Sequence, residues 1–414
     1  MSEPASRLSR RLGTVDVVLV GLGAMIGTGV FVVWRPAAER AATWLLASLC
    51  IAAFVALCNA TSSAQLAAVH PQSGGTYVYG RERLSAGWGA LAGYAFLLGK
   101  LASCAAAALA VGVYLWPEHQ RSVAVAAVVA VTAVNLAGIH QTARLTRWLI
   151  STVIAVLAMV VAIAVGSGER AAAAPALDDV GPFDVLGAAA VVFFAFAGYA
   201  RIATLGEEVK DPARTIPRAV PLALGIVFVV YLAIGAAVLL TLGPDGAAAT
   251  DRPLATMAEV TGGTWLEAIV AATGGVAALA VLLALIAGLA RTTFAMASDG
   301  ELPRFLAAVH EKRRVPHVAE TAIGLIVLVA VLTGGLVGAV SFSAFAVLLY
   351  YAVTNASALR LRPDERRWPR ALAWSGLVAC LALAASLPWQ TAVAGTAGLA
   401  AAMLVRAVVR RRRQ

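Results

Sequence analysis

Four glycines crowded into nine residues are the part of this sequence best suited to bind a small solute. Gly21, Gly23, Gly27 and Gly29 lie within an apolar run over residues 15–33. Glycine weakens a helix by about 1 kcal/mol per site relative to alanine. Inside lipid, backbone groups freed from a helix are tolerated only where they are buried or line a cavity. Interrupted helices bind solutes in this way, since exposed amides attract an anionic group and exposed carbonyls attract a cation.

The same glycines have a purely structural explanation. Small residues four positions apart let two membrane helices approach closely, and Gly23 and Gly27 have this spacing. The glycines by themselves leave both interpretations open.

A second possible break lies in the sixth apolar run, residues 184–206, within the stretch 191–206. The apolar pattern is interrupted at Gly198, and Arg201 follows within one turn. A break in the first helix of each half of an inverted repeat places both breaks beside one central site. This coincidence favours the solute-binding interpretation. Arg201 either pairs with Glu207 or Glu208 or faces the solute path, and the sequence does not decide between them.

The elements that carry these breaks must be membrane helices. The chain has 414 residues, of which 61% are hydrophobic and 13% charged, with a mean hydropathy of +0.84. Soluble proteins contain about 25% charged residues. Apolar runs long enough to cross about 30 Å of hydrocarbon recur along the chain. We therefore predict an all-α integral membrane protein with twelve transmembrane helices, near residues 15–34, 42–67, 86–115, 122–139, 147–167, 184–206, 219–242, 265–297, 319–336, 339–359, 371–388 and 390–408.

The net charge of +10 is explained by membrane topology. With the N-terminus inside, 24 of the 32 lysines and arginines fall on the cytoplasmic side, counting Arg147 and Arg406 at the inner ends of their spans, while 5 fall outside and 3 lie deeper within spans. Such an excess predicts that both termini are cytoplasmic, and we place the protein in a bacterial inner membrane. No nucleic-acid partner is expected. The Arg410–Arg413 run is interpreted as a stop signal or as a contact with anionic membrane lipid.

Lys100 lies near the centre of the third span, about 15 residues from either end. An ionisable side chain at this depth costs several kcal/mol and is by default a functional hypothesis. The alternative is that its long stem carries the ammonium to an interface, although its depth makes that route difficult.

Other classes of function find less support in the sequence. It contains no HExxH or GxSxG motif, so no catalytic residue of a membrane-embedded enzyme is predicted. The glycine run is no dinucleotide fingerprint, because Ile26 stands where GxGxxG needs glycine. A channel and a solute sensor remain alternatives, and a scaffold is disfavoured.

No cofactor or metal site is expected, because the histidines lie in loops. We interpret all four cysteines, which form no CxxC, as small core residues (Cys50, Cys58, Cys104 and Cys380).

Four stretches of the chain match a known family in order and spacing. They are Met25–Phe31 (MIGTGVF), Pro71–Tyr77 (PQSGGTY), Phe193–Arg218 (FFAFAGYARIATLGEEVKDPARTIPR) and Ala290–Gly300 (ARTTFAMASDG). On these motifs the chain resembles the amino acid–polyamine–organocation superfamily of permeases. The resemblance implies a leucine-transporter-like fold: a five-plus-five inverted repeat with discontinuous helices 1 and 6, plus two extra C-terminal helices. The implied divisions are a tail (1–14), the two repeats (15–167 and 184–359), helices 11 and 12 (371–408) and a basic tail (409–414).

The resemblance also implies a function and a site. The function is secondary active transport of amino acids or related amines by alternating access, with proton coupling or exchange. By position, the amides and hydroxyl around Thr28 and Gly29 would hold a carboxylate. The Met25, Phe194 and Ala197 carbonyls would face an ammonium group. Phe194 also falls where the family places an aromatic lid, although core or lipid packing explains it equally well. The complete set of implied substrate-binding residues is Met25, Ile26, Gly27, Thr28, Gly29, Phe194, Ala197, Gly198, Tyr199 and Ala200.

The sequence departs from the family in its charged residues. Ala200 stands where many relatives carry a carboxylate, and residues 150–154 contain no lysine where some proton-coupled members have one. The coupling candidates are instead Lys100 and Arg201. We hypothesise that Lys100 takes the coupling role, because burial disfavours the charged form of an amine. Two cations within spans also favour a neutral or acidic substrate over a dibasic one. The oligomeric state remains open.

Overall fold

The computed structural model describes residues 13–70, 74–138, 143–171, 180–203, 209–311 and 313–411, and its regular elements there are helices. Five short 3-10 turns join them (Ala42–Trp44, Pro117–His119, Ala197–Tyr199, Arg304–Ala307 and Pro363–Glu365). The α-helices are α1 (Thr14–Met25), α2 (Thr28–Val32), α3 (Trp34–Ala41), α4 (Leu45–Val69), α5 (Thr76–Arg83), α6 (Ala86–Leu115), α7 (Gln120–Leu136), α8 (Ala143–Gly166), α9 (Pro182–Phe196), α10 (Ala200–Ala203), α11 (Pro212–Ala248), α12 (Pro253–Gly262), α13 (Thr264–Ser298), α14 (His317–Thr333), α15 (Leu336–Ala358), α16 (Arg370–Ala385) and α17 (Trp389–Arg411).

The apolar helices account for a multi-pass membrane protein. Within the described part of the chain, ten helical segments are long and apolar enough to cross a membrane, judged by length and composition. Two shorter apolar helices, α14 with 17 residues and α16 with 16, occupy the predicted ninth and eleventh spans. These two are therefore shorter than the sequence pattern suggested.

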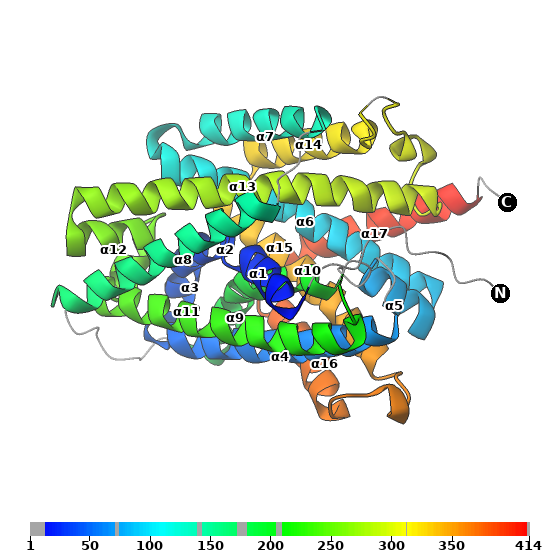
Figure 1. The fold of residues 1–414 in the computed structure, drawn as a ribbon, viewed down its shortest axis with the longest axis horizontal. Coiled ribbons are helices and arrows are strands. Elements are labelled where there is room, and N and C mark those ends of the chain that lie inside the picture. Colours follow the sequence, from blue (N-terminus) through cyan, green and yellow to red (C-terminus); the bar gives the residue numbers. More distant parts are fainter. Residues whose placement is uncertain are drawn as a thin grey trace.

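Both halves of the chain begin with an interrupted helix that is followed by four long ones. The first half runs from α1 and α2 through α4, α6, α7 and α8, and the second runs from α9 and α10 through α11, α13, α14 and α15. In Figure 1, the short helices α1, α2 and α10 lie in the middle of the bundle. Long helices surround them, with α6 packed against both α13 and α15 and with α4 packed against α9 and α11.

Two short helices outside the spans organise the ends of the bundle. The glycine-rich loop after α4, predicted as a short re-entrant or surface piece, contains α5; residues 71–73 of its motif lie outside the described residues. The helix α12, which the pattern did not predict, joins α11 to α13 and buries Leu254, Met257 and Ala258 almost completely.

Two local expectations were wrong. Pro212 and Pro217 in the charged segment 207–218 predict that no continuous helix runs through it, yet α11 begins at Pro212 and continues through Pro217. Pro217 is the sixth residue of this helix and cannot donate to the Ala213 carbonyl, but only that hydrogen bond is lost and the helix continues beyond it. Cys50 is exposed on the outward face of α4, whereas the other three cysteines are buried as predicted.

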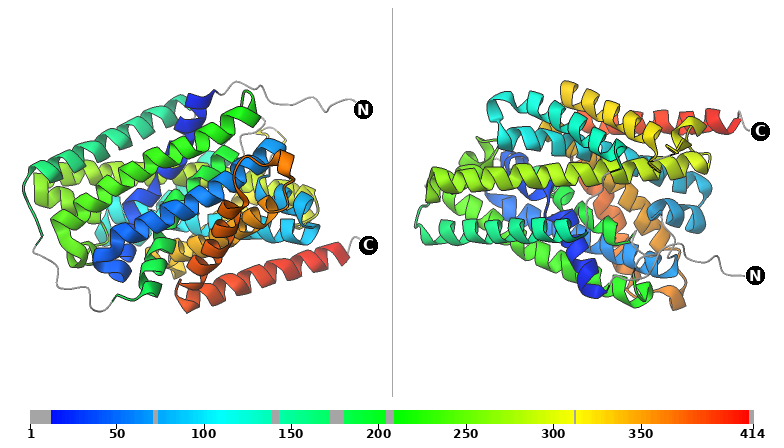
Figure 2. Two further views of the ribbon diagram at one scale, coloured as in Figure 1. Left: turned by 90° about the horizontal axis from the view of Figure 1, so that it is seen from below. Right: turned by 45° about the horizontal axis from the view of Figure 1, so that its top comes forward.

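The C-terminal helix α17 lies at the edge of the bundle, as both views in Figure 2 show. One ion pair fastens it: the Arg406 guanidinium binds the Glu301 carboxylate, and these side chains are only 12% and 6% exposed. Arg406 also donates to the Ala86 carbonyl oxygen at the start of α6, at 3.3 Å. A peripheral helix is thereby tied to the ends of α13 and α6.

A second ion pair joins α5 to the segment between α15 and α16. Arg83 donates to both carboxylate oxygens of Glu365, at 2.9 and 2.8 Å, and its Nε donates to His70 Nε2 at 2.9 Å. The Arg83 and Glu365 side chains are 14% and 13% exposed. The hydrogen bonds from Arg83, and next the backbone amide of Arg362, lower the pKa of Glu365 from 4.5 to about 2. The folded protein therefore favours the ionised carboxylate.

This ion pair predicts a pH-dependent loss of stability. Since the pKa of Glu365 is lowered in the folded state, its contribution is present above about pH 4.5 and is lost as the pH falls towards 2. At pH 7 we expect Glu365→Gln to lower the Tm of the detergent-solubilised protein by roughly 3 °C. The difference in Tm between the wild type and Glu365→Gln should become smaller as the pH falls below 4.5. Asp364→Asn, an exposed neighbour, is the control and should change Tm little. A difference in Tm that stays constant over this pH range contradicts the assignment of the effect to the ionised Glu365 carboxylate.

Candidate solute-binding site

The first predicted break is present. Helix α1 ends at Met25, and α2 begins at Thr28. The two residues between them leave the helical region, Ile26 with φ −82° and ψ 65° and Gly27 with φ −127° and ψ −128°. Across the break the Gly27 N–H donates to the Met25 carbonyl oxygen at 2.9 Å. The crowded glycines thus mark a true interruption of the first span.

The second break is milder than the sequence suggested. Helix α9 ends at Phe196, and the turn Ala197–Tyr199 is a 3-10 turn that leads directly into α10. Ala197, with φ −62° and ψ −4°, stays close to helical geometry. The expectation of an unwound segment here is corrected to a tightened turn. A 3-10 turn keeps i→i+3 hydrogen bonds, so it redirects the helix while freeing few backbone groups.

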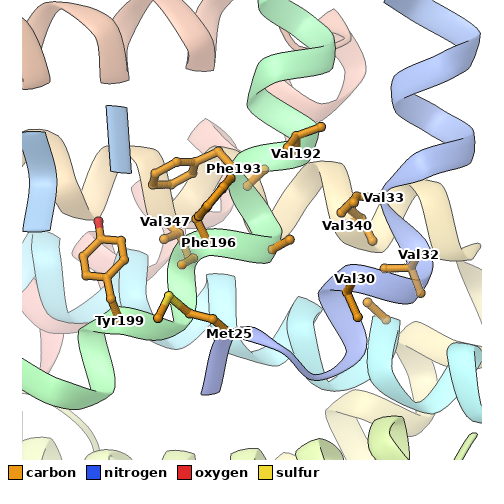
Figure 3. Packing of buried hydrophobic residues seen from close by; sticks show 14 of the residues in the cluster. Met25, Val30, Val32, Val33, Val192, Phe193, Phe196, Tyr199, Val340 and Val347 are labelled. Atoms are coloured by element: carbon orange, nitrogen blue, oxygen red, sulfur yellow. The ribbon is translucent and has the colours of Figure 1, made fainter. Parts of the chain in front are cut away.

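The two breaks lie against each other. A Cβ built on Gly198 would be 2.1 Å from the Ala24 carbonyl oxygen, and one on Gly29 would be 2.6 Å from Ala195 Cα. Figure 3 shows Met25, at the end of α1, beside the turn that carries Tyr199. Only residues without a side chain allow this approach of backbone to backbone.

Close packing also explains the other two glycines near the break. A Cβ on Gly23 would be 2.1 Å from Ile150 Cδ1 on α8, and one on Gly27 would be 2.5 Å from Val281 Cγ2 on α13. Both glycines thus allow close packing, but against side chains of two different helices, so they do not form one small-residue interface with a single neighbour.

Two tyrosines that the sequence analysis missed bind the carbonyls at the breaks. The Tyr231 hydroxyl on α11 donates to the Met25 carbonyl oxygen at 2.7 Å and lies 3.2 Å from that of Ala195. The Tyr351 hydroxyl on α15 donates to the Ala197 carbonyl oxygen at 3.4 Å. Both side chains are fully buried. A tyrosine inside an apolar helix usually needs a partner for its hydroxyl, and that was the available sequence signal.

Thr28 is the polar side chain at the first break. It is 3% exposed, and its hydroxyl has no hydrogen-bond partner within the described residues. Leaving a buried hydroxyl unpaired costs about 1–3 kcal/mol. Because the Thr28 and Gly29 N–H groups also begin α2, the three donors are available to one small anionic group.

The remaining predicted residues divide into two groups. Ile26, Ala197 and Ala200 are buried, whereas Phe194 is half-buried against the core, which does not separate a lid from a packing role. Arg201 is exposed, and the proposed partners Glu207 and Glu208 lie outside the described residues.

Lys100 lies away from the breaks but is connected to them. Its side chain is half-buried, and no carboxylate within the described residues forms a salt bridge with it. Its Nζ lies 5.9 Å from the centre of the Phe96 ring. From there, ring contacts of 5.5, 5.0 and 5.0 Å pass through Tyr350 and Tyr351 to Tyr199 in the second break.

A comparison with known families decides which group of proteins this is. The family described as amino acid permease matches residues 12–405, nearly the whole chain. The chain belongs to this family. The permease is 53% identical to an uncharacterized transporter of Mycobacterium tuberculosis, over 98% of this chain and 94% of that one. The family and its relatives are transporters, which excludes the membrane-embedded enzyme.

More distant relatives of the permease carry more specific names. The branched-chain amino acid permease BcaP of Bacillus subtilis is 27% identical, over 93% of this chain and 90% of its own. Cationic amino acid transporter 4 of Homo sapiens is 30% identical, over 86% of this chain but 60% of its own. The family resemblance seen in the sequence motifs is thereby confirmed.

Proposed function

We propose that this permease is a secondary active transporter that moves amino acids or related amines across the bacterial cytoplasmic membrane by alternating access. One observation carries the proposal: two helix breaks meet in the middle of the bundle beside a buried, unpaired hydroxyl of Thr28. A site that leaves a buried donor unpaired favours a solute that can accept its hydrogen bond. Interrupted helices from the two halves of an inverted repeat would supply the moving parts.

A zwitterion fits the polar groups at the breaks. The Thr28 hydroxyl and the first N–H groups of α2 favour a carboxylate, since the N-terminus of a helix carries partial positive charge. The Met25 carbonyl favours an ammonium group, and in this structure the Tyr231 hydroxyl is bound to it. A solute ammonium at that carbonyl would therefore replace Tyr231, so binding of solute would release a contact between α11 and α1.

A neutral or acidic amino acid fits better than a dibasic one. The ten predicted substrate-binding residues include no carboxylate that would neutralise a second cation. Lys100 lies farther away, joined to the second break only through a series of aromatic rings, and adds a positive charge to the same apolar bundle. The names of the relatives point in both directions, since the Bacillus subtilis protein is a branched-chain amino acid permease and the human one a cationic amino acid transporter, so the preference rests on the charges of this chain. For coupling, we propose proton exchange at Lys100, with Arg201 as the second candidate, and we place both termini in the cytoplasm because of the excess of basic residues on that side.

Counterflow in proteoliposomes tests this function. With labelled leucine, glutamate and arginine, we expect saturable counterflow of leucine or glutamate and little of arginine. Thr28→Val, which removes the hydroxyl and keeps the shape, should raise the half-saturating concentration about tenfold. Thr28→Ser, which keeps the hydroxyl, should stay within about threefold. Currents at channel rates would refute the carrier function. Equal affinities of Thr28→Val and Thr28→Ser for the solute would refute the site.

A further inference from the structure

A buried cluster of polar side chains lies behind Tyr199, where α4, α15 and α16 meet. Every side chain in it is 0–1% exposed. Helix α16, in the region predicted to be peripheral, takes part through a cysteine and through a glycine that packs on an amide. The members of the cluster are Asn59, Ser62, Tyr199, Tyr351, Asn355 and Cys380, with Gly376 beside them.

The hydrogen bonds of the cluster fix the orientation of both amides. Asn355 Nδ2 donates to the Tyr351 backbone carbonyl oxygen at 3.0 Å, and a carbonyl can only accept. The same Nδ2 donates to Asn59 Oδ1 at 2.6 Å, and this oxygen also accepts from the Cys380 thiol at 3.2 Å. Asn59 Nδ2 and Asn355 Oδ1 are consequently left without a partner within the described residues.

Two hydroxyl groups near these amides also lack a hydrogen bond. The Tyr199 hydroxyl forms no hydrogen bond of ordinary geometry within the described residues, although the Tyr351 hydroxyl and the Asn59 amide both lie close enough to interact with it as hydrogen-bonding groups. The Ser62 hydroxyl, one turn from Asn59 on the same face of α4, is also unpaired. Four of the twelve unpaired buried polar atoms of the described residues therefore lie on these contacting elements, whereas most buried polar atoms in proteins are paired.

One small ligand could satisfy three of these four groups together. A buried water makes about three hydrogen bonds to otherwise unsatisfied polar atoms. It can accept from Asn59 Nδ2 and donate to Asn355 Oδ1, while the Tyr199 hydroxyl supplies a third partner. A metal cation fits less well, because no member of the cluster is a carboxylate that would balance its charge. Gly376 packs directly on the Asn355 amide, because a Cβ there would be 2.7 Å from Oδ1 and 2.8 Å from Nδ2.

We propose that Asn59, Asn355 and Tyr199 enclose a buried water, and that this hydrated cluster positions Tyr199 in the solute site. Tyr199 stacks on Tyr351 with ring centres 5.0 Å apart and an angle of 28°. The stack and the water-bound hydroxyl together fix the ring on the side away from α1. Asn59 and Asn355 are therefore positioning residues, and α16 supports the site from behind. The expected effect on solute affinity rests on the proposed function, whereas the presence of the water does not.

Two measurements test the proposal separately. A high-resolution cryo-EM map of the full-length protein should show density within hydrogen-bond distance of Asn59 Nδ2, Asn355 Oδ1 and the Tyr199 hydroxyl. In Gly376→Ala, whose added Cβ crowds Asn355, that density should shift or disappear. A wild-type map without this density refutes the proposed water, whether or not any solute is transported.

The second measurement is a cycle of uptake kinetics. Asn355→Leu should raise the half-saturating concentration of the transported amino acid about fivefold, with the maximal rate within twofold. In a Tyr199→Phe background the same substitution should change affinity less than twofold, because Asn355 acts through the tyrosine hydroxyl. An equal effect in both backgrounds overturns the positioning role. Where Asn355→Leu folds poorly, Asn59→Ser takes its place in the cycle.

A matched control separates positioning from general stability. Asn135, on α7, is also buried and donates from its Nδ2 to the Leu283 carbonyl oxygen at 3.3 Å. Asn135→Leu should lower the Tm without changing solute affinity. If it changes affinity as much as Asn355→Leu, loss of any buried amide explains the effect and the proposal fails.

Discussion

Gly198→Ala is expected to reduce transport about a hundredfold while the protein still folds. The added Cβ would lie 2.1 Å from the Ala24 carbonyl oxygen and 2.7 Å from the Met25 backbone nitrogen. Backbone atoms cannot rotate away as a side chain can, so α1 and the turn Ala197–Tyr199 must separate at the place where the two breaks meet. Overpacking of this kind costs about 1–3 kcal/mol, and the upper figure corresponds to somewhat more than a hundredfold in affinity.

The matched control is a glycine whose Cα faces open space. A Cβ added to Gly225 in α11 would have no neighbouring atom within 4 Å, so Gly225→Ala should leave uptake within twofold of the wild type. Alanine also favours helices over glycine by about 1 kcal/mol, so any loss in Gly198→Ala comes from the contact and not from the helix itself. Uptake in proteoliposomes and size-exclusion profiles measure the two quantities. Wild-type uptake by Gly198→Ala would show that the breaks need not touch.

Lys100→Met is expected to abolish the stimulation of uptake by an inward proton gradient, while exchange of internal for external solute persists. Lys100 is in the middle of α6, half-buried over the Phe96 ring, and forms no salt bridge within the described residues. An amine in such surroundings gives up its proton more readily than one in water. Its loss should therefore remove the proton from the transport cycle and leave the solute site intact.

Lys100→Arg distinguishes titration from charge. Arginine stays protonated in proteins, so it keeps the positive charge but cannot release a proton. If Lys100 carries the proton, Lys100→Arg should lose the response to the gradient as completely as Lys100→Met. If Lys100 serves only as a fixed cation, arginine should restore the response. Arg201→Met, at the second candidate, provides the comparison, and a gradient response that survives in both Lys100 variants contradicts the coupling role.

The sequence alone was sufficient for the class of protein and for the first break. Composition and runs of apolar residues are properties of the local chain, and they predict membrane helices because the bilayer demands about 20 apolar residues per crossing. The crowding of Gly21 to Gly29 is equally local, and the structure places an interruption at Ile26 and Gly27 within it. The family motifs likewise need no tertiary information.

Tertiary structure decided which distant residues complete the site. The Tyr231 hydroxyl reaches Met25 across 206 positions of the chain, and Asn355 reaches Asn59 across 296. No periodicity within one helix encodes such distances, because they depend on how several helices cross. Gly198 shows the same limit: it was predicted as a point of unwinding, yet its contact with Ala24 explains why glycine is there. The sequence shows where a helix is weak, whereas the packing of the helices determines which atoms contact that position.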